Sequence, residues 1–385
     1  MKKVLVLLAM VLGITNMYAQ NYDLEGLAKA CSESETVYSF HEGLAKICKD
    51  GKYGFMDKTG KIVIPTIYRQ AIDFHEGLAA VKKDEKYGYI DKEGNVVLPF
   101  RFDDADYFMG GYARVHEGPD SVADSGQDYN YLIDKMGIPI QEDSYNIEGN
   151  YSDGLIRVRS IDTDKYGFAN AKGQIVIPFL YDSAFDFKEG VARVSKNGKD
   201  EFIDKSGRTV LPFRDKVGYS YTCSEGLIYF QKEIRSLYFF GFMNKQGYVA
   251  IPPIYGNVRD FHDGLAWVQW DSWEGFIDTN GKKVLECKYC PESGFNEGMA
   301  VIEKNDKYGY INRAGQIIAP FSFDEANDFS EGLGLVKKGR RYGYIDKRGN
   351  STFDFSIVQQ SIKEEEENDS IDEVIDEVFA SDNIQ

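Results

Sequence analysis

Apolar and polar residues alternate along most of this chain in short segments that end at glycine-containing turns. In the clearest segments, apolar residues stand two and four positions after a glycine, as Ala45 and Ile47 follow Gly43. Alternation with a period of two is typical of a β-strand that has one buried face. The pattern therefore predicts a chain built from short antiparallel strands.

The alternating segments belong to a unit that occurs nine times. A unit opens with an aromatic residue, a variable residue, an acidic residue and a glycine, as in Phe40-His41-Glu42-Gly43. The glycines that align the units are Gly43, Gly77, Gly111, Gly154, Gly190, Gly226, Gly264, Gly298 and Gly332. Repeats of this length indicate stacked or ring-shaped arrays, because one unit is too small to bury its apolar face alone.

Each unit continues with a second strand, a turn and a third strand. The second strand has the pattern of residues 86–91, Lys-Tyr-Gly-Tyr-Ile-Asp, and its glycine predicts close approach by an aromatic side chain of the neighbouring unit. The turn has Asp or Asn first and glycine fourth, as in residues 57–60, which fits a type I turn closed by a bulge. In the third strand, Pro65 and its equivalents indicate a strand end or an unpaired edge.

These features predict an all-β protein of tandem three-stranded antiparallel units of about 34–38 residues. We expect the units to stack as an open β superhelix, because their spacing is unequal and a closed ring demands even angular spacing. The alternative is a closed propeller-like ring. The expected organisation is a signal peptide at 1–19, an N-terminal cap at 20–39, nine repeats at 40–355 and an acidic C-terminal tail at 356–385.

The repeats resemble the WG-repeat family of bacterial proteins, also described as KWG repeats. The match rests on residues 52–57, 86–91, 307–312 and 341–346, together with the acid-Gly-Leu-Ala motif that precedes them. Here Tyr-Gly replaces the Trp-Gly of the family. The resemblance implies a repetitive β protein, often exported, with a binding role and no catalytic residues to carry over.

The two ends of the sequence differ in character from the repeats. Lys2 and Lys3 precede an apolar stretch at 4–14, and Ala19 offers a cleavage point, which together predict a secretory signal. We therefore expect an exported protein, located in the periplasm, at the cell surface or outside the cell, with no membrane span. In the tail, helical spacing predicts a short amphipathic helix that caps the last repeat or docks on a partner, through Ile371, Val374, Ile375, Val378 and Phe379. The alternative is a disordered tail, since short isolated helices are marginal.

Charge and cysteine content narrow the class of partner. The formal net charge is -17, which argues against nucleic acid and anionic membranes as partners. The five cysteines do not recur with the repeat, and their odd number leaves at least one unpaired within the monomer. Cys287 and Cys290 form a lone C-x-x-C without the helix of a redox motif or the second pair of a zinc site, so a local disulfide or two thiols is the better interpretation.

Three tryptophans in the seventh unit form the candidate surface for a ligand or partner. Trp270 and Trp273 stand where other units have lysine, and Trp267 aligns with basic residues in some units and with Val301 and Leu335 in others. Positions that accept lysine are expected to be solvated, and exposed indoles favour contact with a glycan, peptide or partner. The alternative is local repacking around Glu274, which takes the usual tyrosine position.

Other polar residues are weaker candidates. His41 and His75 could lie one unit apart beside Glu42 and Glu76, so a metal site is conceivable, but lysine and serine take the same position elsewhere. The acidic row could attract calcium, yet single carboxylates one unit apart make poor cages, and we expect turn residues. No nucleophile elbow, phosphate loop or zinc-protease motif is found. We expect no cofactor, no metal and no enzymatic activity.

The function predicted from the sequence is a binding or interaction scaffold at the bacterial cell envelope or outside it, with an unidentified protein partner. The alternative is a glycan or cell-wall binding protein that uses the tryptophan cluster.

Overall fold

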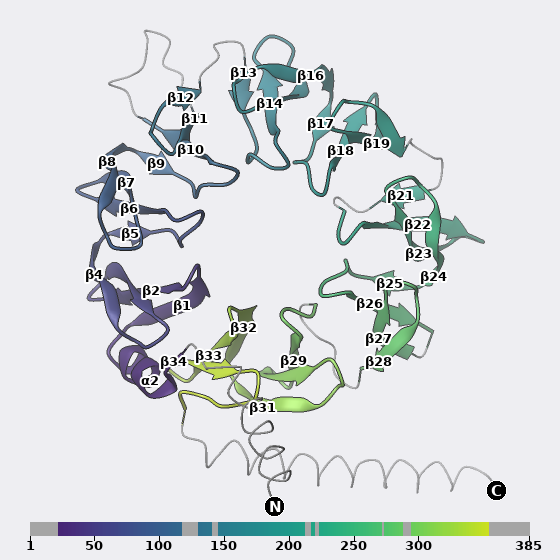
Figure 1. Ribbon diagram of the computed structural model, residues 1–385. Helices are drawn as coiled ribbons and strands as arrows, with labels where there is room; N and C mark the ends of the chain where they lie inside the picture. Colours follow the sequence, from purple (N-terminus) through teal and green to yellow (C-terminus); the bar gives the residue numbers. More distant parts are fainter. Residues whose placement is uncertain are drawn as a thin grey trace, which may run out of the picture.

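The computed structural model describes residues 22–117, 130–140, 145–211, 217–219, 223–271, 273–287 and 294–353. Nine small antiparallel β-sheets, here called blades 1 to 9 in chain order, are arranged in a closed ring (Figure 1). The predicted signal segment 1–19 and the predicted tail helix with Ile371, Val374, Ile375, Val378 and Phe379 lie outside the described residues. No helix in the described part of the chain has the length and apolar character to cross a membrane.

The ring begins with α2 (Leu24–Ser32), and the blades follow in sequence order. Blade 1 contains β1 (Thr36–His41), β2 (Leu44–Lys49), β3 (Lys52–Asp57) and β4 (Ile62–Tyr68). Blade 2 contains β5 (Gln70–Ala71), β6 (Ala79–Lys83), β7 (Lys86–Ile90) and β8 (Val96–Phe102). Blade 3 contains β9 (Asp104–Ala105), β10 (Tyr112–His116), β11 (Asn130–Asp134) and β12 (Pro139–Ile140).

Blade 4 contains β13 (Tyr145–Ile147), β14 (Ile156–Ser160), β15 (Tyr166–Ala169) and β16 (Ile175–Tyr181). Blade 5 contains β17 (Ser183–Ala184), β18 (Val191–Lys196), β19 (Lys199–Asp204) and β20 (Thr209–Leu211). Blade 6 contains β21 (Val217–Tyr219), β22 (Leu227–Ile234), β23 (Leu237–Asn244) and β24 (Val249–Tyr255).

Blade 7 contains β25 (Asn257–Val258), β26 (Leu265–Trp270), β27 (Trp273–Asp278) and β28 (Lys283–Glu286). Blade 8 contains β29 (Met299–Lys304), β30 (Lys307–Asn312) and β31 (Ile317–Phe323). Blade 9 contains β32 (Glu325–Ser330), β33 (Leu333–Lys338) and β34 (Arg341–Asp346). The predicted three-stranded unit is therefore incomplete: among the described residues, eight blades have a further strand, often of two residues, that leads into the opening motif.

The predicted alternation is confirmed. The apolar residues two and four positions after the aligning glycine are buried in all nine blades, from Ala45 and Ile47 to Val336. The opening motif is a two-residue hairpin turn: His41 pairs with Leu44, and the intervening Glu42 and Gly43 have φ values of 52° and 88°. Positive φ at both central residues is the requirement of a type I′ turn, which matches strand twist and favours glycine. These turns point toward the centre of the ring (Figure 1).

The strand glycine has a different neighbour from the one expected. A Cβ at Gly54 would lie 2.4 Å from the carbonyl oxygen of Ile64 and 2.7 Å from that of Pro65, both in the third strand of the same blade. The prediction of an aromatic side chain from the next unit is therefore wrong. The cause is a bulge, since Tyr53 pairs with Tyr68 but Phe55 pairs with Ile64. Pro65 lies within this bulge on the last strand of the sheet, which confirms the predicted edge position.

Adjacent blades share an aromatic core. The aromatic residue after the strand glycine packs edge-on against the aromatic residue that opens the next blade, as Phe55 does against Phe74 with ring centroids 4.8 Å apart. The other edge-on pairs are Tyr89–Phe108, Phe168–Phe187, Phe242–Phe261, Phe276–Phe295 and Tyr310–Phe329, with centroids 4.7 to 5.0 Å apart. Each pair buries two rings in the favoured geometry. A blade therefore completes its core only with its neighbour.

The last and first blades make the corresponding aromatic contact, with the rings tilted, so the ring is closed. The Tyr344 ring of blade 9 lies 5.1 Å from that of Phe40 in blade 1, and its hydroxyl donates a hydrogen bond to the Tyr38 carbonyl oxygen at 2.5 Å. Ser330 Oγ also donates to the Phe40 carbonyl oxygen at 2.6 Å. The expected open β superhelix is therefore wrong, and the closed propeller-like ring is the correct alternative. The unequal spacing arises because the connections within some units are longer. These connections take no part in the contacts between blades, so they do not prevent closure.

Helix α2 contributes to the core between blades 9 and 1. In the core between blades 2 and 3, the third-strand residues Leu98 and Phe102 fill the space between the sheets. Between blades 9 and 1, Leu27, Ala30 and Cys31 of α2 fill the equivalent position. The helix begins at the capping residue Asp23, whose carboxylate accepts from Glu25 N. Among the described residues, α2 thus takes the place in this seam that the last strand of a blade takes between blades 2 and 3.

This role of α2 gives a first prediction. Leu27→Ala removes a fully buried side chain (0 % exposed) from the closing core and should lower the free energy of unfolding by about 2–4 kcal/mol. Ile62→Ala, at a 44 % exposed position on β4, should change it by less than about 0.5 kcal/mol. Urea and thermal unfolding of the full chain measure both. Equal effects of the two substitutions would show that α2 does not contribute to closure.

Candidate functional site

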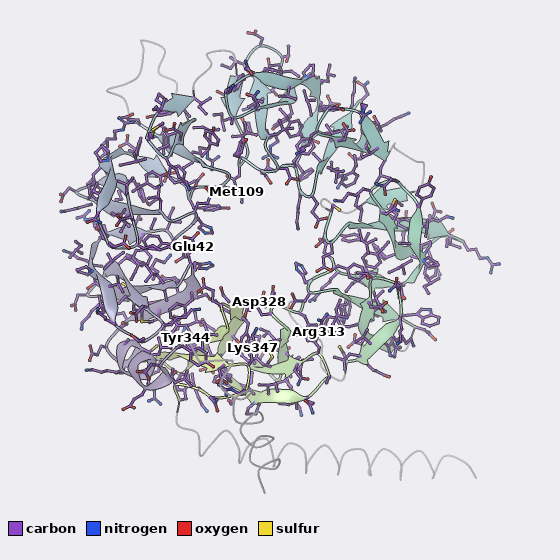
Figure 2. The ribbon with its side chains drawn as sticks, in the orientation of Figure 1. Glu42, Met109, Arg313, Asp328, Tyr344 and Lys347 are labelled. Atoms are coloured by element: carbon purple, nitrogen blue, oxygen red, sulfur yellow. The ribbon has the colours of Figure 1, made fainter. Side chains whose placement is uncertain are left out.

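A belt of carboxylates links the blades along the inner margin of the ring, where Figure 2 labels Glu42. In eight of the nine opening turns, the acidic residue accepts a hydrogen bond from the backbone N–H of the aligning glycine in the next blade. Eight such bonds, of 2.6 to 3.1 Å, join Glu42 to Gly77, Glu76 to Gly111, Asp153 to Gly190, Glu189 to Gly226, Glu225 to Gly264, Asp263 to Gly298, Glu297 to Gly332 and Glu331 to Gly43. The last bond crosses the closing seam. We call each bond and its cation, described next, a clasp.

The second turn of seven blades contributes the cation of the clasp. Lys58 Nζ lies 2.9 Å from a carboxylate oxygen of Glu331 and donates to its carbonyl oxygen at 2.9 Å. The same position supplies Lys92 to Glu42, Lys135 to Glu76, Lys245 to Glu189 and Lys347 to Glu297, at 3.0 to 3.3 Å. Lys205 and Arg313 instead donate to the carbonyl oxygens of Asp153 and Asp263. The Asp-Lys-x-Gly turn of one blade thus holds the acid-Gly turn of the preceding blade.

The clasps stabilise the ionised form of the acids. Burial raises the pKa of Glu42, but the N–H of Gly77 and the ammonium of Lys92 outweigh it and hold that pKa below its ordinary value of 4.5. Glu76, Glu189 and Glu297 have lowered pKa values by the same balance of burial against donors. These carboxylates are therefore structural anions. The sequence contained the signal for them, because the acid and the lysine recur together, but spacing alone does not show that they meet across blades.

One seam lacks both members of the clasp. In blade 3 the acidic position is Gly110, and in blade 4 the matching lysine position is Ala171. Leu132 also replaces the aromatic residue, so no edge-on pair forms with Tyr151. Between blades 6 and 7, Thr279 replaces only the lysine, and Glu225 keeps its bonds to Gly264. The seam between blades 3 and 4 is thus the least regular of those described.

The two histidines considered as metal ligands do lie one blade apart. The rings of His41 and His75 have centroids 5.7 Å apart, and the ring of His75 lies tilted against that of Tyr107, with centroids 4.3 Å apart. His41 Nε2 is 3.9 Å from a carboxylate oxygen of Asp73. Among the described residues, no three His, Cys, Asp or Glu side chains gather in a way that could hold a metal ion. The arrangement is a row of three rings in contact.

A hollow of about 660 Å³ lies at the closing seam. Its wall is formed by β1, β32 and blade 8, and Figure 2 labels Asp328 there, at the inner margin. Polar lining residues are Ser39, His41, Tyr308, Asn327, Asp328 and Ser330. Asp324, also in the lining, pairs with Lys307. Two of these polar groups link neighbouring blades, since Ser330 donates to the Phe40 carbonyl oxygen and Asp324 pairs with Lys307.

The three tryptophans occupy different environments. Trp267 is buried in the core between blades 7 and 8, so its indole is not part of the exposed surface. Trp270 is 43 % exposed and pairs across the hairpin with half-buried Trp273. The ammonium of Lys283 lies 4.2 Å from the ring centroid of Trp273 and 5.3 Å from that of Trp270. Only the outer pair therefore presents an aromatic surface.

The described cysteines do not form a framework. Cys31, Cys48 and Cys223 are buried free thiols. Burial raises the pKa of both Cys31 and Cys223 to about 12, so neither thiol is a ready nucleophile. Cys290 lies outside the described residues.

The fold and the repeated clasps define a closed β-repeat ring, and the sequence comparison agrees. A family model described as WG containing repeat matches residues 33–53, 53–87, 87–118, 166–199, 240–271, 275–308 and 308–342. The matches cover more than half of the chain and confirm the resemblance deduced from the motifs. The chain belongs to the family of WG-repeat proteins. No curated protein matches it.

Solved structures resemble the ring only distantly. The tricorn protease aligns with 10 % identity and a TM-score of 0.24, over 75 % of this chain and 35 % of its own. Hsv2p of Kluyveromyces lactis aligns with 9 % identity and a TM-score of 0.34, over 62 % and 92 %. AztD of Citrobacter koseri aligns with 13 % identity and a TM-score of 0.32, over 66 % and 85 %. The chain spans about a third of the tricorn protease, and similarities this low carry no argument about function.

The clasps make stability depend on pH. Because the pKa of Glu297 is lower in the folded chain, its clasp stabilises the fold above the ordinary pKa of 4.5 and is lost as the pH falls through the folded-state value. Glu297→Gln should therefore reduce the free energy of unfolding by about 1 kcal/mol at neutral pH and by less near pH 3.

Urea unfolding between pH 7 and pH 3 measures this difference. Glu93→Gln, at an exposed turn position outside the belt, is the matched control and should follow the parent protein at every pH. A Glu297→Gln deficit that stays constant down to pH 3 would contradict the assigned role.

Proposed function

We propose that this protein is a non-catalytic binding scaffold that presents its outer rim to a protein partner. The support is a row of exposed apolar residues at corresponding places on the last strands of blades 1, 2, 4 and 6. This outer apolar strip consists of Ile62 and Ile67 of β4, Val96 and Val97 of β8, Ile175, Val176 and Leu180 of β16, and Val249 and Ile254 of β24, each 38 to 53 % exposed. Figure 1 shows these four strands on the outer side of the ring.

The strip is suited to binding because its strands are sheet edges. β4, β8, β16 and β24 are last in their sheets, so their outer edges pair with no other strand in the described part of the chain. Exposed apolar side chains on a sheet edge attract a partner chain unless a feature blocks continuous pairing. Pro65, Pro99, Pro178 and Pro252 interrupt each edge, which disfavours extended sheet growth and leaves side-chain contact as the mode of binding.

The proposal places the protein outside the cytoplasm. Its support is the charged and apolar pattern of residues 1–19 in the sequence. The proposal also assigns no catalysis, since the most regular acidic and basic side chains serve as clasps between blades.

A second candidate function is glycan binding through Trp270 and Trp273. One observation favours it: Trp270 is 43 % exposed at a hairpin where other blades have lysine. An exposed indole face offers a flat apolar surface beside polar groups, which suits a sugar ring. Trp267 is buried and does not belong to this surface.

The scaffold function is tested by polar substitution of the outer apolar strip. Ile62→Thr, Val96→Thr, Ile175→Thr and Val249→Thr together should reduce recovery of a cross-linked partner from native cells at least about tenfold, because they remove the apolar contact and keep β propensity. The matched control carries Glu93→Thr, Lys172→Thr and Gln246→Thr, at exposed turn positions, and should retain the partner. Full recovery with the strip variant would overturn the proposal.

The glycan function is tested by Trp270→Ala. Loss of the exposed indole should abolish pull-down on cell-wall glycan, with an expected loss of about tenfold or more in affinity. Tyr248→Ala, at a 72 % exposed aromatic position in blade 6, is the control and should bind as the parent does. Unchanged glycan binding by Trp270→Ala would exclude this candidate.

A further inference from the structure

The eight bonds from an acidic residue to the glycine of the next blade show what the acid-Gly turn of a blade binds. In each, a carboxylate accepts from the glycine N–H, and in two of them it also accepts from the N–H of the acidic residue just before that glycine. Glu189, for example, accepts from both Glu225 N and Gly226 N at 2.7 Å. Two adjacent residues with positive φ direct their N–H groups toward one anion, which is a recognised backbone anion site. The chain itself thus demonstrates the ligand chemistry of this turn.

The turn of blade 4 has the same conformation but no carboxylate. Asp153 and Gly154 have φ values of 53° and 91°, as in the other blades, and both are exposed. The residue that would supply the acid is Gly110, so no described side chain accepts from Gly154 N. The Asp153 carboxylate does not compete, because it accepts from Gly190 N of the next blade at 2.6 Å.

The space above Gly110 is taken by Tyr151. A Cβ at Gly110 would lie 2.4 Å from Cδ1 of Tyr151, so this seam accommodates no acidic side chain from position 110. The ring of Tyr151 packs on Tyr112, with centroids 4.9 Å apart, and its hydroxyl lies 4.0 Å from the Cβ position of Gly154. Burial raises the pKa of Tyr151, so the hydroxyl remains a proton donor at neutral pH. A third donor therefore stands beside the turn.

We propose that the turn formed by Asp153 and Gly154, with the Tyr151 hydroxyl beside it, binds a carboxylate side chain of a partner polypeptide. The inference rests on the proposed scaffold function and assigns it a second contact, on the inner side of the ring, where Figure 2 labels the neighbouring Met109. Ala171 replaces the lysine of the clasp, so the partner's acid meets hydrogen-bond donors without an ion pair. Such a contact is weak alone and acts within a larger interface.

Chemical-shift titration of the full chain, labelled with ¹⁵N-glycine, tests the site. The probe is acetyl-Gly-Glu-Gly-amide, and the matched control is acetyl-Gly-Gln-Gly-amide. The Gly154 amide should move to lower field and saturate with the Glu peptide, at least about fivefold more than with the Gln peptide at equal concentration. The Gly190 amide, which already donates to Asp153, should not move. No response at Gly154, or an equal response to both peptides, overturns the proposal.

Two variants examine the donors. Tyr151→Phe removes only the hydroxyl and should weaken the Glu-peptide response about threefold. The double variant Gly110→Glu with Tyr151→Ala supplies an internal acid and room for it, and should abolish the response, whereas Tyr151→Ala alone should keep it. Retained binding by the double variant contradicts the site. Inorganic phosphate is a separate probe, and a response to phosphate without one to the Glu peptide rejects a carboxylate partner.

Failure of this site and failure of the scaffold function give different results. Partner recovery that depends on the outer apolar strip, without a Gly154 response, rejects the site and keeps the scaffold. A Gly154 response specific for the Glu peptide, with partner recovery indifferent to the outer strip, keeps the site and rejects the outer rim as the binding surface.

Discussion

The structure depends on a core that no blade completes alone. The buried ring of Phe55 lies at the boundary of blade 1, and its partner Phe74 belongs to the opening of blade 2. Because every blade needs a neighbour on both sides, an open array would expose one unfinished core at each end. Closure removes both ends, and the Tyr344–Phe40 contact with Leu27 of α2 is how this chain achieves it. The ring therefore closes because each core is formed by two neighbouring blades.

The clasp explains why glutamate tolerates an unfavourable backbone conformation. Glu42 and its equivalents have φ near 52°, a region that costs a non-glycine residue about 1 kcal/mol or more. In exchange, the side chain reaches the glycine N–H and the lysine of the next blade, where charge-assisted hydrogen bonds offset the strain. The same turn therefore shapes the hairpin and fastens the neighbouring blade, which accounts for its recurrence in every regular unit.

Local structure could be predicted from the sequence, and contacts between blades could not. The period-two alternation at Ala45 and Ile47 and the turn at Gly43 are set by short-range constraints that each unit repeats. The neighbour of Gly54 depends on a bulge near Pro65, which alternation does not encode. The burial of Trp267 follows from its alignment with Val301 and Leu335, both buried, rather than with the basic residues of other units. Closure itself joins residues about 300 positions apart, as in Tyr344 and Tyr38, and no local pattern specifies it.

The conformational entropy lost on closing the ring explains which seam keeps its contacts and which seam has lost its clasp. Closing the seam between blades 9 and 1 carries the largest entropic cost, because it joins the two ends of the whole ring. This seam keeps the contacts of Glu331 with Gly43, Lys58 with Glu331, and Ser330 with Phe40. The seam between blades 3 and 4 joins units that the chain already holds together, so loss of the clasp at Gly110 and Ala171 costs the ring less. Because the turn of Asp153 and Gly154 binds no carboxylate of blade 3, it can bind another ligand. The turn keeps the conformation of the other blades, so its N–H groups remain oriented toward a carboxylate.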